Sequence, residues 1–311
     1  MPSVSEILSS PPAVVRTHRD LVTVSGPDAA SYLQGQLSQD LTSLDDRGAW
    51  TFVLAPQGKV EAWARIRRSA EDRFELMVGA GAGEVLEQRL KRFLLRTRAD
   101  VALLSGVETI SIRGGGAAEV VAALESTGVT AWLWAGWPGV VGLDVAVGGD
   151  TDGVVDGEQV ISDLASQGIP ARTPEDLEAV RIAAGVPAWG SEIDGETIPA
   201  TIGQWAIDAS VSFTKGCYTG QELVARIDSR GGNVPRVLHR VEISGPPPAS
   251  GTELAVEGHS AGPITSAVAR PGGSVALAWV PRSVTVDGTG ADAVVDGHPA
   301  RVLPPPAWTG A

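Results

Sequence analysis

The first two thirds of the chain alternates between strand-like and helix-like patterns of apolar residues. Alternation over 21–24 and apolar runs at 50–54, 60–66, 74–78 and 98–104 predict strands. Apolar residues near helical spacing predict an amphipathic helix over 84–95, and the sequence also favours helices over 29–37, 159–166 and 174–184. From about residue 107 the order of strands and helices repeats, with a strand expected at 109–112, a helix at 117–124 and strands at 131–134 and 140–147. This repetition predicts two related α+β units rather than a doubly wound sheet.

The pattern changes after the turn Gly231-Gly232-Asn233-Val234-Pro235. Residues 236–311 contain short apolar runs separated by Gly and Pro turns, which is typical of a small all-β barrel or sandwich. We therefore expect a body over 1–235 and a C-terminal β-barrel over 236–311. Within the body, the two α+β units are expected at about 14–105 and 106–235, with interleaved elements allowed. Residues 1–13, rich in Ser and Pro, are expected to be a loose lead-in.

Composition narrows the classes of function. The net charge of −13 is unlike that of a general DNA- or RNA-binding protein, so no direct nucleic-acid partner is expected. A small anion in a local basic pocket is not excluded. No run approaches 18 apolar residues and the N-terminus lacks a signal-peptide pattern, so we expect no membrane partner and a cytoplasmic location. One cysteine and four scattered histidines give no metal-ligand spacing, and no permanently bound metal is expected.

The stretch Lys215-Gly216-Cys217-Tyr218-Thr219-Gly220-Gln221-Glu222 contains the only cysteine and one of three lysines. Thr219 and Glu222 have the spacing of a capping box ahead of a helical pattern. A helix N-terminus and the nearby Lys215 ammonium both favour thiolate over thiol, which would make Cys217 reactive. The alternative is that Cys217 is a buried, small apolar residue, as lone cysteines commonly are.

These residues carry a family resemblance. The segment 213–222 resembles the signature of the YgfZ-type folate-binding proteins, whose relatives include mitochondrial iron–sulfur assembly factors and the glycine-cleavage aminomethyltransferase. Further matches occur in order along the chain, so that the resemblance covers roughly residues 14–311. They are Tyr32-Leu33-Gln34-Gly35-Gln36-Leu37-Ser38-Gln39-Asp40, Leu54-Ala55-Pro56-Gln57-Gly58-Lys59, Arg96-Thr97-Arg98-Ala99-Asp100-Val101 and Arg181-Ile182-Ala183-Ala184-Gly185-Val186-Pro187.

The resemblance implies both a fold and a function. The fold is α+β: two ferredoxin-like units form a T-protein-like body with tetrahydrofolate in a central cavity, followed by a small barrel. The implied function is that of a tetrahydrofolate-binding accessory protein that supports iron–sulfur cluster assembly or repair in client enzymes, including tRNA-modifying ones. The implied cofactor is tetrahydrofolate or a one-carbon derivative, and the implied partners are folate and iron–sulfur client or assembly proteins.

Departures from the aminomethyltransferase pattern affect the expected activity. Ala62 and Trp63 stand where that enzyme has its catalytic acid, and Ala183 stands where a folate-contacting glutamate is found. Glu61 is offset by one position, which on a strand points its side chain to the other face. We therefore do not expect a conventional enzyme. The alternative is a folate-dependent aminomethyl or methyl transferase, or a demethylase, that uses another catalytic group. A third hypothesis is a Cys217-dependent enzyme unrelated to folate.

The expected site residues follow from the motifs. Cys217 and Lys215 are the expected reactive pair. The expected folate-binding residues are Gln36, Asp40, Trp205, Tyr218, Gln221, Glu222 and Arg226, with further charge from Arg230 and Arg236. Three of these residues could instead have purely structural roles. Arg226 could form an i,i+4 ion pair with Glu222, Asp40 could lie at a helix end, and Trp205 could pack in the core. Lys59 is expected to be a turn residue that could also contact a ligand.

Overall fold

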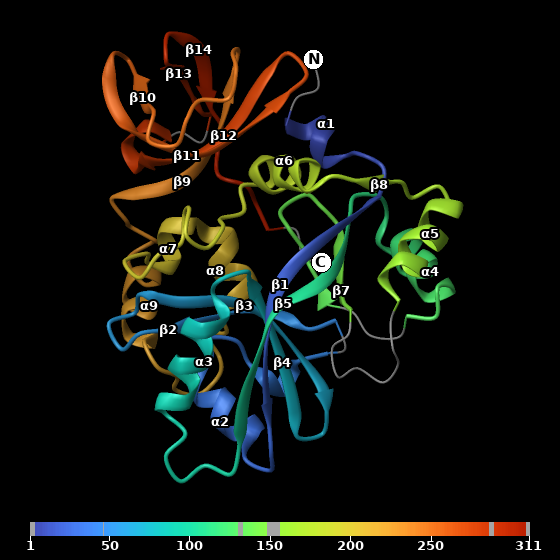
Figure 1. Ribbon diagram of the computed structural model, residues 1–311. Helices are drawn as coiled ribbons and strands as arrows, with labels where there is room; N and C mark the ends of the chain where they lie inside the picture. Colours follow the sequence, from blue (N-terminus) through green and yellow to red (C-terminus); the bar gives the residue numbers. More distant parts are fainter. Residues whose placement is uncertain (1–3, 46, 130–132, 148–155, 286–288, 309–311) are drawn as a thin grey trace.

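The computed structural model describes residues 4–45, 47–129, 133–147, 156–285 and 289–308. The described part of the body contains one eight-stranded sheet in the order β2-β3-β4-β1-β5-β7-β6, with β8 paired to β1. Its strands are β1 (Ala13–Ser25), β2 (Ala49–Leu54), β3 (Val60–Ala70), β4 (Arg73–Gly79), β5 (Asp100–Arg113), β6 (Leu133–Trp134), β7 (Gly142–Ala146) and β8 (Ala171–Arg172). The two long strands β1 and β5 cross the middle of the molecule (Figure 1) and join the two halves of the sheet.

Helices cover one face of this sheet in two groups. The helices of the body are α1 (Val4–Leu8), α2 (Ala29–Gln36), α3 (Gly83–Arg92), α4 (Ala117–Ser126), α5 (Gly157–Ser166), α6 (Pro174–Ala184), α7 (Pro199–Ile202), α8 (Gln204–Ser210) and α9 (Gln221–Asp228), with a 3-10 turn at Leu41–Ser43. Helices α2 and α3 bury Leu33 and Leu86 against Ala64 of β3. Helices α4 and α5 cover the β5–β7 half in a second core.

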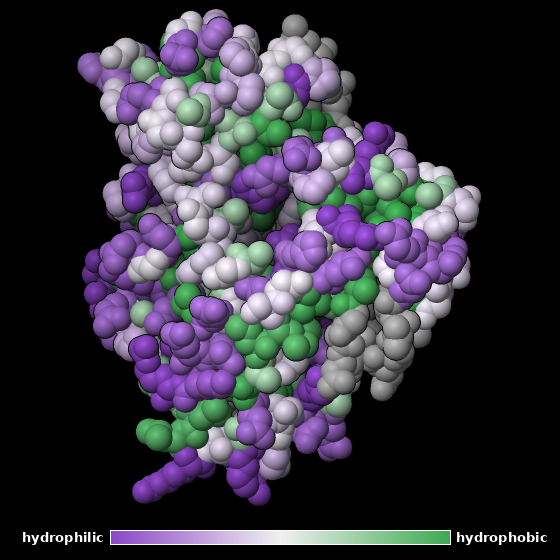
Figure 2. All heavy atoms as spheres, viewed as in Figure 1, coloured by the Kyte–Doolittle hydropathy of each residue, from purple (hydrophilic) through white to green (hydrophobic). Residues whose placement is uncertain are grey.

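The opposite, inner face of the sheet packs against α6, α8, α9 and the loops between them. Phe52 and Trp63 of this face contact a core that includes Trp205 of α8 and Val224 of α9. Hydrophilic residues cover much of the outer surface around α3 and α9, with hydrophobic residues visible between them (Figure 2). The sheet is thus covered on both faces around Phe52 and Trp63, whereas the first half of β5 is largely exposed.

A closed six-stranded barrel follows the body, in the order β10-β11-β12-β9-β14-β13. Its strands are β9 (Arg236–Ile243), β10 (Glu253–Val256), β11 (His259–Arg270), β12 (Gly273–Pro281), β13 (Ala291–Val295) and β14 (His298–Val302). Leu238, Val275 and Leu277 of the barrel pack on Ile182 and Ala183 of α6. The mixed α+β architecture with a C-terminal β-barrel is confirmed.

Several expectations about individual elements need correction. The expected lead-in contains a short helix, α1, whose Val4 is buried, and β1 begins at Ala13 instead of residue 21. The strands expected at 98–104 and 109–112 form the single strand β5, which runs through residues 105 and 106. Of the strand expected at 131–134, residues 131 and 132 lie outside the described residues, and Leu133–Trp134 form β6. Within the described part of the chain, no helix is long and apolar enough to cross a membrane.

Candidate functional site

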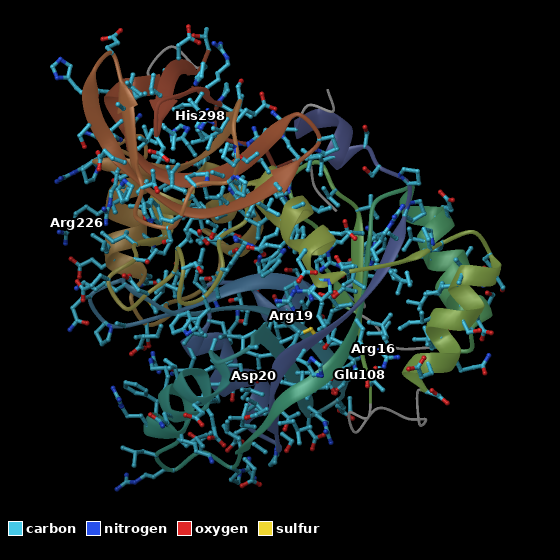
Figure 3. All side chains as sticks on the ribbon, turned by 45° about the horizontal axis from the view of Figure 1, so that its top comes forward. Arg16, Arg19, Asp20, Glu108, Arg226 and His298 are labelled. Atoms are coloured by element: carbon cyan, nitrogen blue, oxygen red, sulfur yellow. The ribbon has the colours of Figure 1, made fainter. Side chains whose placement is uncertain are left out.

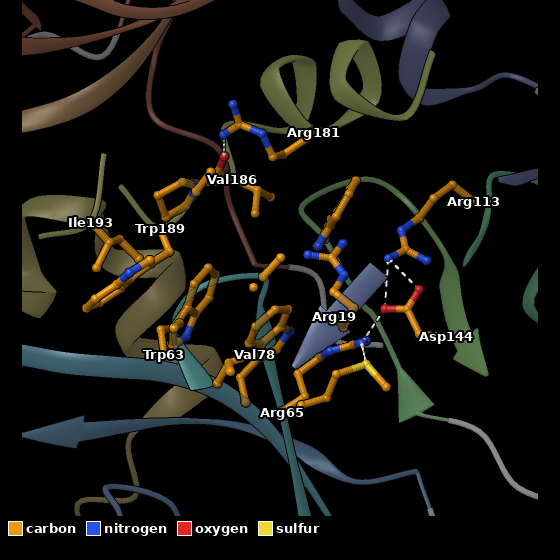
Figure 4. A pocket seen from close by; sticks show the side chains of 18 residues that line it. Arg19, Trp63, Arg65, Val78, Arg113, Asp144, Arg181, Val186, Trp189 and Ile193 are labelled. Atoms are coloured by element: carbon orange, nitrogen blue, oxygen red, sulfur yellow. Dashed lines mark hydrogen bonds and ion pairs between the residues drawn. The ribbon is translucent and has the colours of Figure 1, made fainter. Parts of the chain in front are cut away.

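A cavity of about 210 Å³ lies between the inner face of the sheet and the segment that follows α6 (Figure 4). Tryptophan and arginine side chains dominate its lining. The lining residues are Arg19, Trp50, Trp63, Arg65, Met77, Val78, Gly79, Ala80, Ala82, Arg113, Trp137, Asp144, Arg181, Val186, Pro187, Ala188, Trp189 and Ile193. We call this space the central cavity.

One side of the central cavity is aromatic. The rings of Trp50 and Trp63 are stacked, with their centroids 4.1 Å apart. Trp63 also meets Trp205 edge to face at 5.6 Å and donates from Nε1 to Ser210 Oγ at 3.0 Å. These contacts hold Trp63 in place, so that flat apolar surface faces the cavity. Such surface suits a planar heteroaromatic ring.

The other side of the central cavity is cationic. Arg65 and Arg113 both contact the carboxylate of Asp144, with Arg113 Nη2 at 3.1 Å from Oδ2. Burial lowers the pKa of Arg65 to about 10, against the opposing effect of Asp144. Burial alone would raise the pKa of Asp144, but the neighbouring guanidinium groups, Arg113 foremost, lower it below its ordinary value. Asp144 is therefore an ionised partner of these arginines.

The alternation of residues along β3 produces this inner face. Trp63 and Arg65 point to the cavity, whereas Ala62, Ala64 and Ile66 pack under α2 and α3. Strand register then assembles the site, because Arg65 pairs with Trp50 of β2 and with Met77 of β4. The sequence signal was the alternation of small apolar residues with Trp and Arg over 62–66, which had not been assigned to a site.

The segment after α6 forms the remaining wall. As predicted, α6 spans residues 174–184; it begins with a Thr173 cap and Pro174, and it is followed by Gly185, whose φ is 75°. Arg181 donates to Val186 O and, at 3.2 Å, to Glu192 Oε2, while Ala188 N donates to the same oxygen at 2.8 Å. Glu192 Oε1 accepts from Ser266 of the barrel at 2.5 Å. A buried carboxylate thus fixes this wall to both the body and the barrel.

Lys215 of the motif lies beside the end of α2. Its Nζ donates to the carbonyl oxygens of Gln34, Leu37 and Gln39 at 2.8, 2.7 and 2.8 Å. Burial lowers the pKa of Lys215 to about 8, with Asp40 opposing the shift. All three ammonium hydrogens are used by the backbone, so this lysine stabilises the docking of the motif against α2.

The capping box expected at Thr219 and Glu222 is absent from the start of α9. The N-cap is Gly220 in a left-handed conformation, with φ 81° and no side-chain cap. Instead Gln221 Oε1 accepts from Tyr218 N at 3.1 Å, and Thr219 N donates to Gly35 O at 3.1 Å. Tertiary contacts therefore hold the entry to this helix.

Cys217 is exposed and free and does not line the central cavity. Its neighbour Tyr218 is buried in the core, which raises the pKa of the Tyr218 phenol to about 12. Cys217 thus lies on a rigid backbone between the Lys215 anchor and the buried Tyr218. No group of three or more Cys, His, Asp or Glu side chains able to hold a metal occurs among the described residues.

The other expected site residues also lie outside the central cavity. Gln36 accepts from Arg89, Asp40 caps the 3-10 turn by accepting from Thr42 N, and Trp205 is fully buried. Glu222 and Arg226 form the exposed i,i+4 pair at 2.6 Å, and Figure 3 shows Arg226 at the outer edge, far from Arg19.

Lys59, Arg236 and Glu61 also make structural contacts outside the cavity. Lys59 pairs with Glu196 at 2.5 Å, and the Arg236 guanidinium lies 5.6 Å from the Trp279 ring. As expected from its offset, Glu61 points away from the cavity and pairs with Arg89 of α3 at 2.5 Å. None of the expected residues lines the cavity, although Trp205 and Tyr218 belong to the hydrophobic core that includes the lining residue Trp63.

Comparison with known proteins finds related sequences and related structures. No protein-family model matches the sequence. The tRNA-modifying protein YgfZ of Edwardsiella ictaluri is 30% identical over 227 residues, which are 68% of this chain and 65% of that protein. YgfZ of Klebsiella pneumoniae is also 30% identical, over 68% of this chain and 66% of its own length. The match thus spans slightly less than two thirds of these two relatives.

A longer sequence match is found with a fungal protein, and a match in fold is found with an enzyme. The mitochondrial iron–sulfur cluster assembly factor IBA57 homolog of Pyricularia oryzae is 28% identical over 92% of this chain and 77% of its own length. The aminomethyltransferase T of the glycine cleavage system from Bartonella henselae aligns over 98% of this chain and 90% of that one, with a TM-score of 0.76 and 19% identity. At that identity the likeness shows the fold alone. The chain is therefore similar in sequence to the YgfZ and IBA57 proteins and has the fold of the glycine-cleavage aminomethyltransferase.

Proposed function

We propose that this protein binds a reduced folate in the central cavity and supports iron–sulfur cluster assembly or repair in client enzymes, including tRNA-modifying ones, in the cytoplasm. The observation that carries the proposal is the pairing of stacked indoles with buried guanidinium groups around one cavity, in a chain similar to the YgfZ and IBA57 proteins. The names of the relatives, a tRNA-modifying protein and an iron–sulfur cluster assembly factor, support the same role.

Tetrahydrofolate fits the chemistry of the lining. Its pterin is planar and suits the surface of Trp63, and its glutamate carries carboxylates that guanidinium groups bind in pairs. Arg65 has a buried Nη1 without a hydrogen-bond partner, so the cavity has donor capacity left for a ligand. Trp63 and Arg65 would hold the two ends of the molecule. Bound folate would supply a one-carbon unit or a reduced ring at that position.

Cys217 is proposed to act at the protein surface. A single thiolate cannot hold a cluster, since clusters are held by about four protein ligands. Because Cys217 is exposed beside an anchored backbone, it is accessible to a client or assembly protein that supplies the other ligands. The iron–sulfur cluster is then cargo that this protein contacts transiently.

The transferase alternative is less well supported by the cavity. Among the described residues that line it, Asp144 is the only carboxylate, and it accepts from Arg65 and Arg113. A carboxylate whose pKa is lowered by two guanidinium contacts is a poor general base at neutral pH. Turnover of a methyl or aminomethyl donor with tetrahydrofolate would support that alternative against the accessory role.

The test combines binding with complementation. Tetrahydrofolate is titrated into wild type and Cys217→Ala, with tryptophan fluorescence as the readout, and both are expressed in a strain lacking its own copy. We expect equal folate affinity, but loss of cluster-enzyme activity in the Cys217→Ala strain. The control Arg226→Gln alters only an exposed ion pair and should restore activity fully.

Two results would contradict the proposal, each in a different part. Failure of wild type to bind tetrahydrofolate would refute the folate-binding role. Full restoration of cluster-enzyme activity by Cys217→Ala would refute the role of the cysteine. Rapid alkylation of Cys217 together with absent folate binding would favour the Cys217-dependent enzyme unrelated to folate.

A further inference from the structure

Positive charge is concentrated at the end of α3, in residues 89–98, which we call the basic segment. It contains five of the 24 Lys and Arg residues of the chain and no acidic residue. Lys91 and Arg98 are paired with neighbouring carboxylates. Arg92 and Arg96 are exposed, and neither pairs with an acid among the residues that the structure describes. These two arginines therefore give a local positive surface to a protein whose net charge is −13.

The basic segment also holds apolar side chains in water. Leu94 packs against the core under α2 and α3, whereas Leu95 is 86% exposed and Phe93 is 39% exposed. The turn after Leu95 passes through Arg96, whose φ of 59° is unfavourable for a residue with a side chain. Hydrophobic surface is visible at the lower left of Figure 2, where Figure 1 places the end of α3. Single exposed apolar residues are common, but strained turns cluster at ligand and partner sites.

The basic segment and the segment with the exposed cysteine contact the same end of α2. Arg89 Nη1 donates to Gln36 Oε1 at 3.0 Å, and the Arg89 guanidinium lies 4.2 Å from the Phe93 ring centroid. Thr219 N, two residues after the cysteine, donates to Gly35 O at 3.1 Å. Neighbouring residues of one helix end thus touch both segments. An interface of ordinary size covers roughly 800 Å² on each partner, which is enough to include both.

We infer that the basic segment, together with Phe213 and Cys217, is the docking surface for an acidic partner protein with an apolar pocket for Leu95. Phe213 is 51% exposed and extends the apolar contact toward the free thiol. An acidic partner is repelled by most of this acidic protein and attracted to Arg92 and Arg96, which fixes its orientation. The inference rests on the proposed function and names the surface through which a client or assembly protein reaches Cys217.

The charge of the protein favours a protein partner over larger anionic surfaces. Nucleic acids and anionic membranes present many negative charges, and their binding needs a correspondingly large number of cations. Two unpaired arginines in a chain of net charge −13 supply few. They are sufficient to orient a compact acidic protein whose affinity comes from burying Leu95 and Phe93.

The first experiment uses the deletion strain and compares the docking surface with the barrel. Leu95→Ser, and separately the double variant Arg92→Glu with Arg96→Glu, should lower cluster-enzyme activity about fivefold or more, because each removes an anchor of the contact. Folate affinity should stay within about twofold of wild type, and circular dichroism checks that each variant folds. The controls Val294→Ser and Arg301→Glu change an exposed apolar residue and an exposed arginine of the barrel and should restore activity fully.

The second experiment identifies the class of partner in the same strain. A photoreactive benzoylphenylalanine in place of Leu95 should form an adduct with an acidic protein that carries an iron–sulfur cluster, whereas the same group in place of Val294 should not. The double variant Arg92→Glu with Arg96→Glu should abolish the adduct. Once purified, the captured partner should bind wild type about tenfold more tightly than the double variant at low salt, and the difference should shrink as salt is added.

Two results would overturn the inference, and both differ from failure of the proposed function. Full restoration of cluster-enzyme activity by Leu95→Ser and by the double arginine variant would show that this surface is not used. Adducts with phospholipid, RNA or a second copy of this chain alone, or no adduct, would show that no acidic partner protein docks there. If wild type itself does not restore cluster-enzyme activity, the proposed function fails instead.

Discussion

Lys215 satisfies the backbone at a point where α2 ends. The last carbonyl groups of a helix have no partner within it, and here one ammonium binds Gln34 O, Leu37 O and Gln39 O. The lysine comes from 178 residues further along the chain than Leu37. A residue expected to activate sulfur thus has its donors committed to the fold, whereas Cys217 beside it is left accessible.

Replacing Lys215 by methionine should destabilise the protein. The change leaves three carbonyl oxygens without their donor, which we expect to lower the free energy of unfolding by about 2–4 kcal/mol in urea denaturation. Lys59→Met, which removes an exposed pair with Glu196, should cost no more than about 1 kcal/mol. Equal effects of the two substitutions would show that the three contacts contribute little.

Wild type and Lys215→Met also allow a test of how stability depends on pH. The pKa of Lys215 is about 8 in the folded protein, whereas an unfolded lysine has a value of about 10.4. Between these values the unfolded chain binds more protons, so the free energy of unfolding rises with pH. The stability difference between wild type and Lys215→Met should therefore increase from pH 8 to pH 10. A difference that is constant over this range would contradict the lowered pKa.

At this scale the sequence was informative about the motif and not about the cavity. The 213–222 segment stands out because of its glycines, its lysine and its single cysteine. Arg65 does not, since an arginine between alanine and isoleucine is equally typical of a solvated strand face. Only the register of β2, β3 and β4 shows that this face is covered, and register depends on contacts that one sequence does not contain.

At the scale of elements, the β2–β3 turn and the start of α9 interlock through glycines. A Cβ at Gly220, whose φ is +81°, would lie 2.5 Å from Ala55 O and 2.6 Å from Leu54 Cβ. A Cβ at Gly58 would lie 2.5 Å from Leu223 Cβ. The two backbones approach closely because both positions lack side chains. The segment with Cys217 is therefore positioned by the hairpin whose strand β3 also supplies Trp63 and Arg65.

Comparing Gly220→Ala with Gly128→Ala should separate the cost of the steric clash at this close approach from the cost of backbone strain. Gly128 has the same φ of +81° with no atom within 4 Å of its virtual Cβ, so Gly128→Ala reports strain alone. We expect Gly220→Ala to lower the free energy of unfolding by about 1–3 kcal/mol more than Gly128→Ala, as in other overpacked sites. Thermal or urea unfolding of both variants measures this. Similar losses in the two variants would mean that the turn can move aside.

Elements with strong local signals were predictable, and elements shaped by distant contacts were not. The cap at Thr173, Pro174 and Gly185 define α6 without outside help. In β5, Gly106 interrupts the apolar pattern and suggested a boundary. The structure keeps one strand because the buried Asp20 of β1 accepts from Gly106 N at 2.9 Å, opposite a register shift in β1. A residue 86 positions away thus converts a predicted break into a bulge.

At the scale of the whole molecule, residues 303–308, which we call the C-terminal tail, connect the barrel to the body. Arg240 of β9 donates to Pro304 O at 3.0 Å and, at 3.3 Å, to Ala183 O of α6. The tail continues past Gly185 to Trp308, whose ring stacks on Trp205 with 6.3 Å between centroids. The tail covers a tryptophan that itself supports Trp63 of the cavity.

Trp308→Ala should weaken this connection. Trp308 is half-buried, so we expect a loss of about 1–3 kcal/mol in the free energy of unfolding, less than for a fully buried tryptophan. Loss of the ring also leaves Trp205 uncovered. Because Trp205 supports Trp63 of the cavity, the affinity for folate should fall as well. Val294→Ala, an exposed barrel position, serves as the control with a change below about 0.5 kcal/mol. Unchanged stability in Trp308→Ala would show that the stacking is incidental.

The overall architecture was predictable because the family resemblance covers nearly the whole chain. The central cavity was not, because its lining comes from β1, β2, β3, β4, β5, β7 and the segment after α6, which meet only in the folded sheet. Sequence motifs identify segments one at a time. When a site is made of single side chains from many strands, no one strand has a sequence pattern that identifies the site.

The position of β1 in the middle of the sheet has a consequence for synthesis of the protein. This strand leaves the ribosome early, yet its partners β5 and β8 follow only at residues 100–113 and 171–172. Lys215, which completes the end of α2, arrives later still. Long-range pairing of this kind slows folding and leaves strand edges open meanwhile. We therefore expect nascent chains shorter than about 215 residues to depend on chaperones and to be sensitive to proteases.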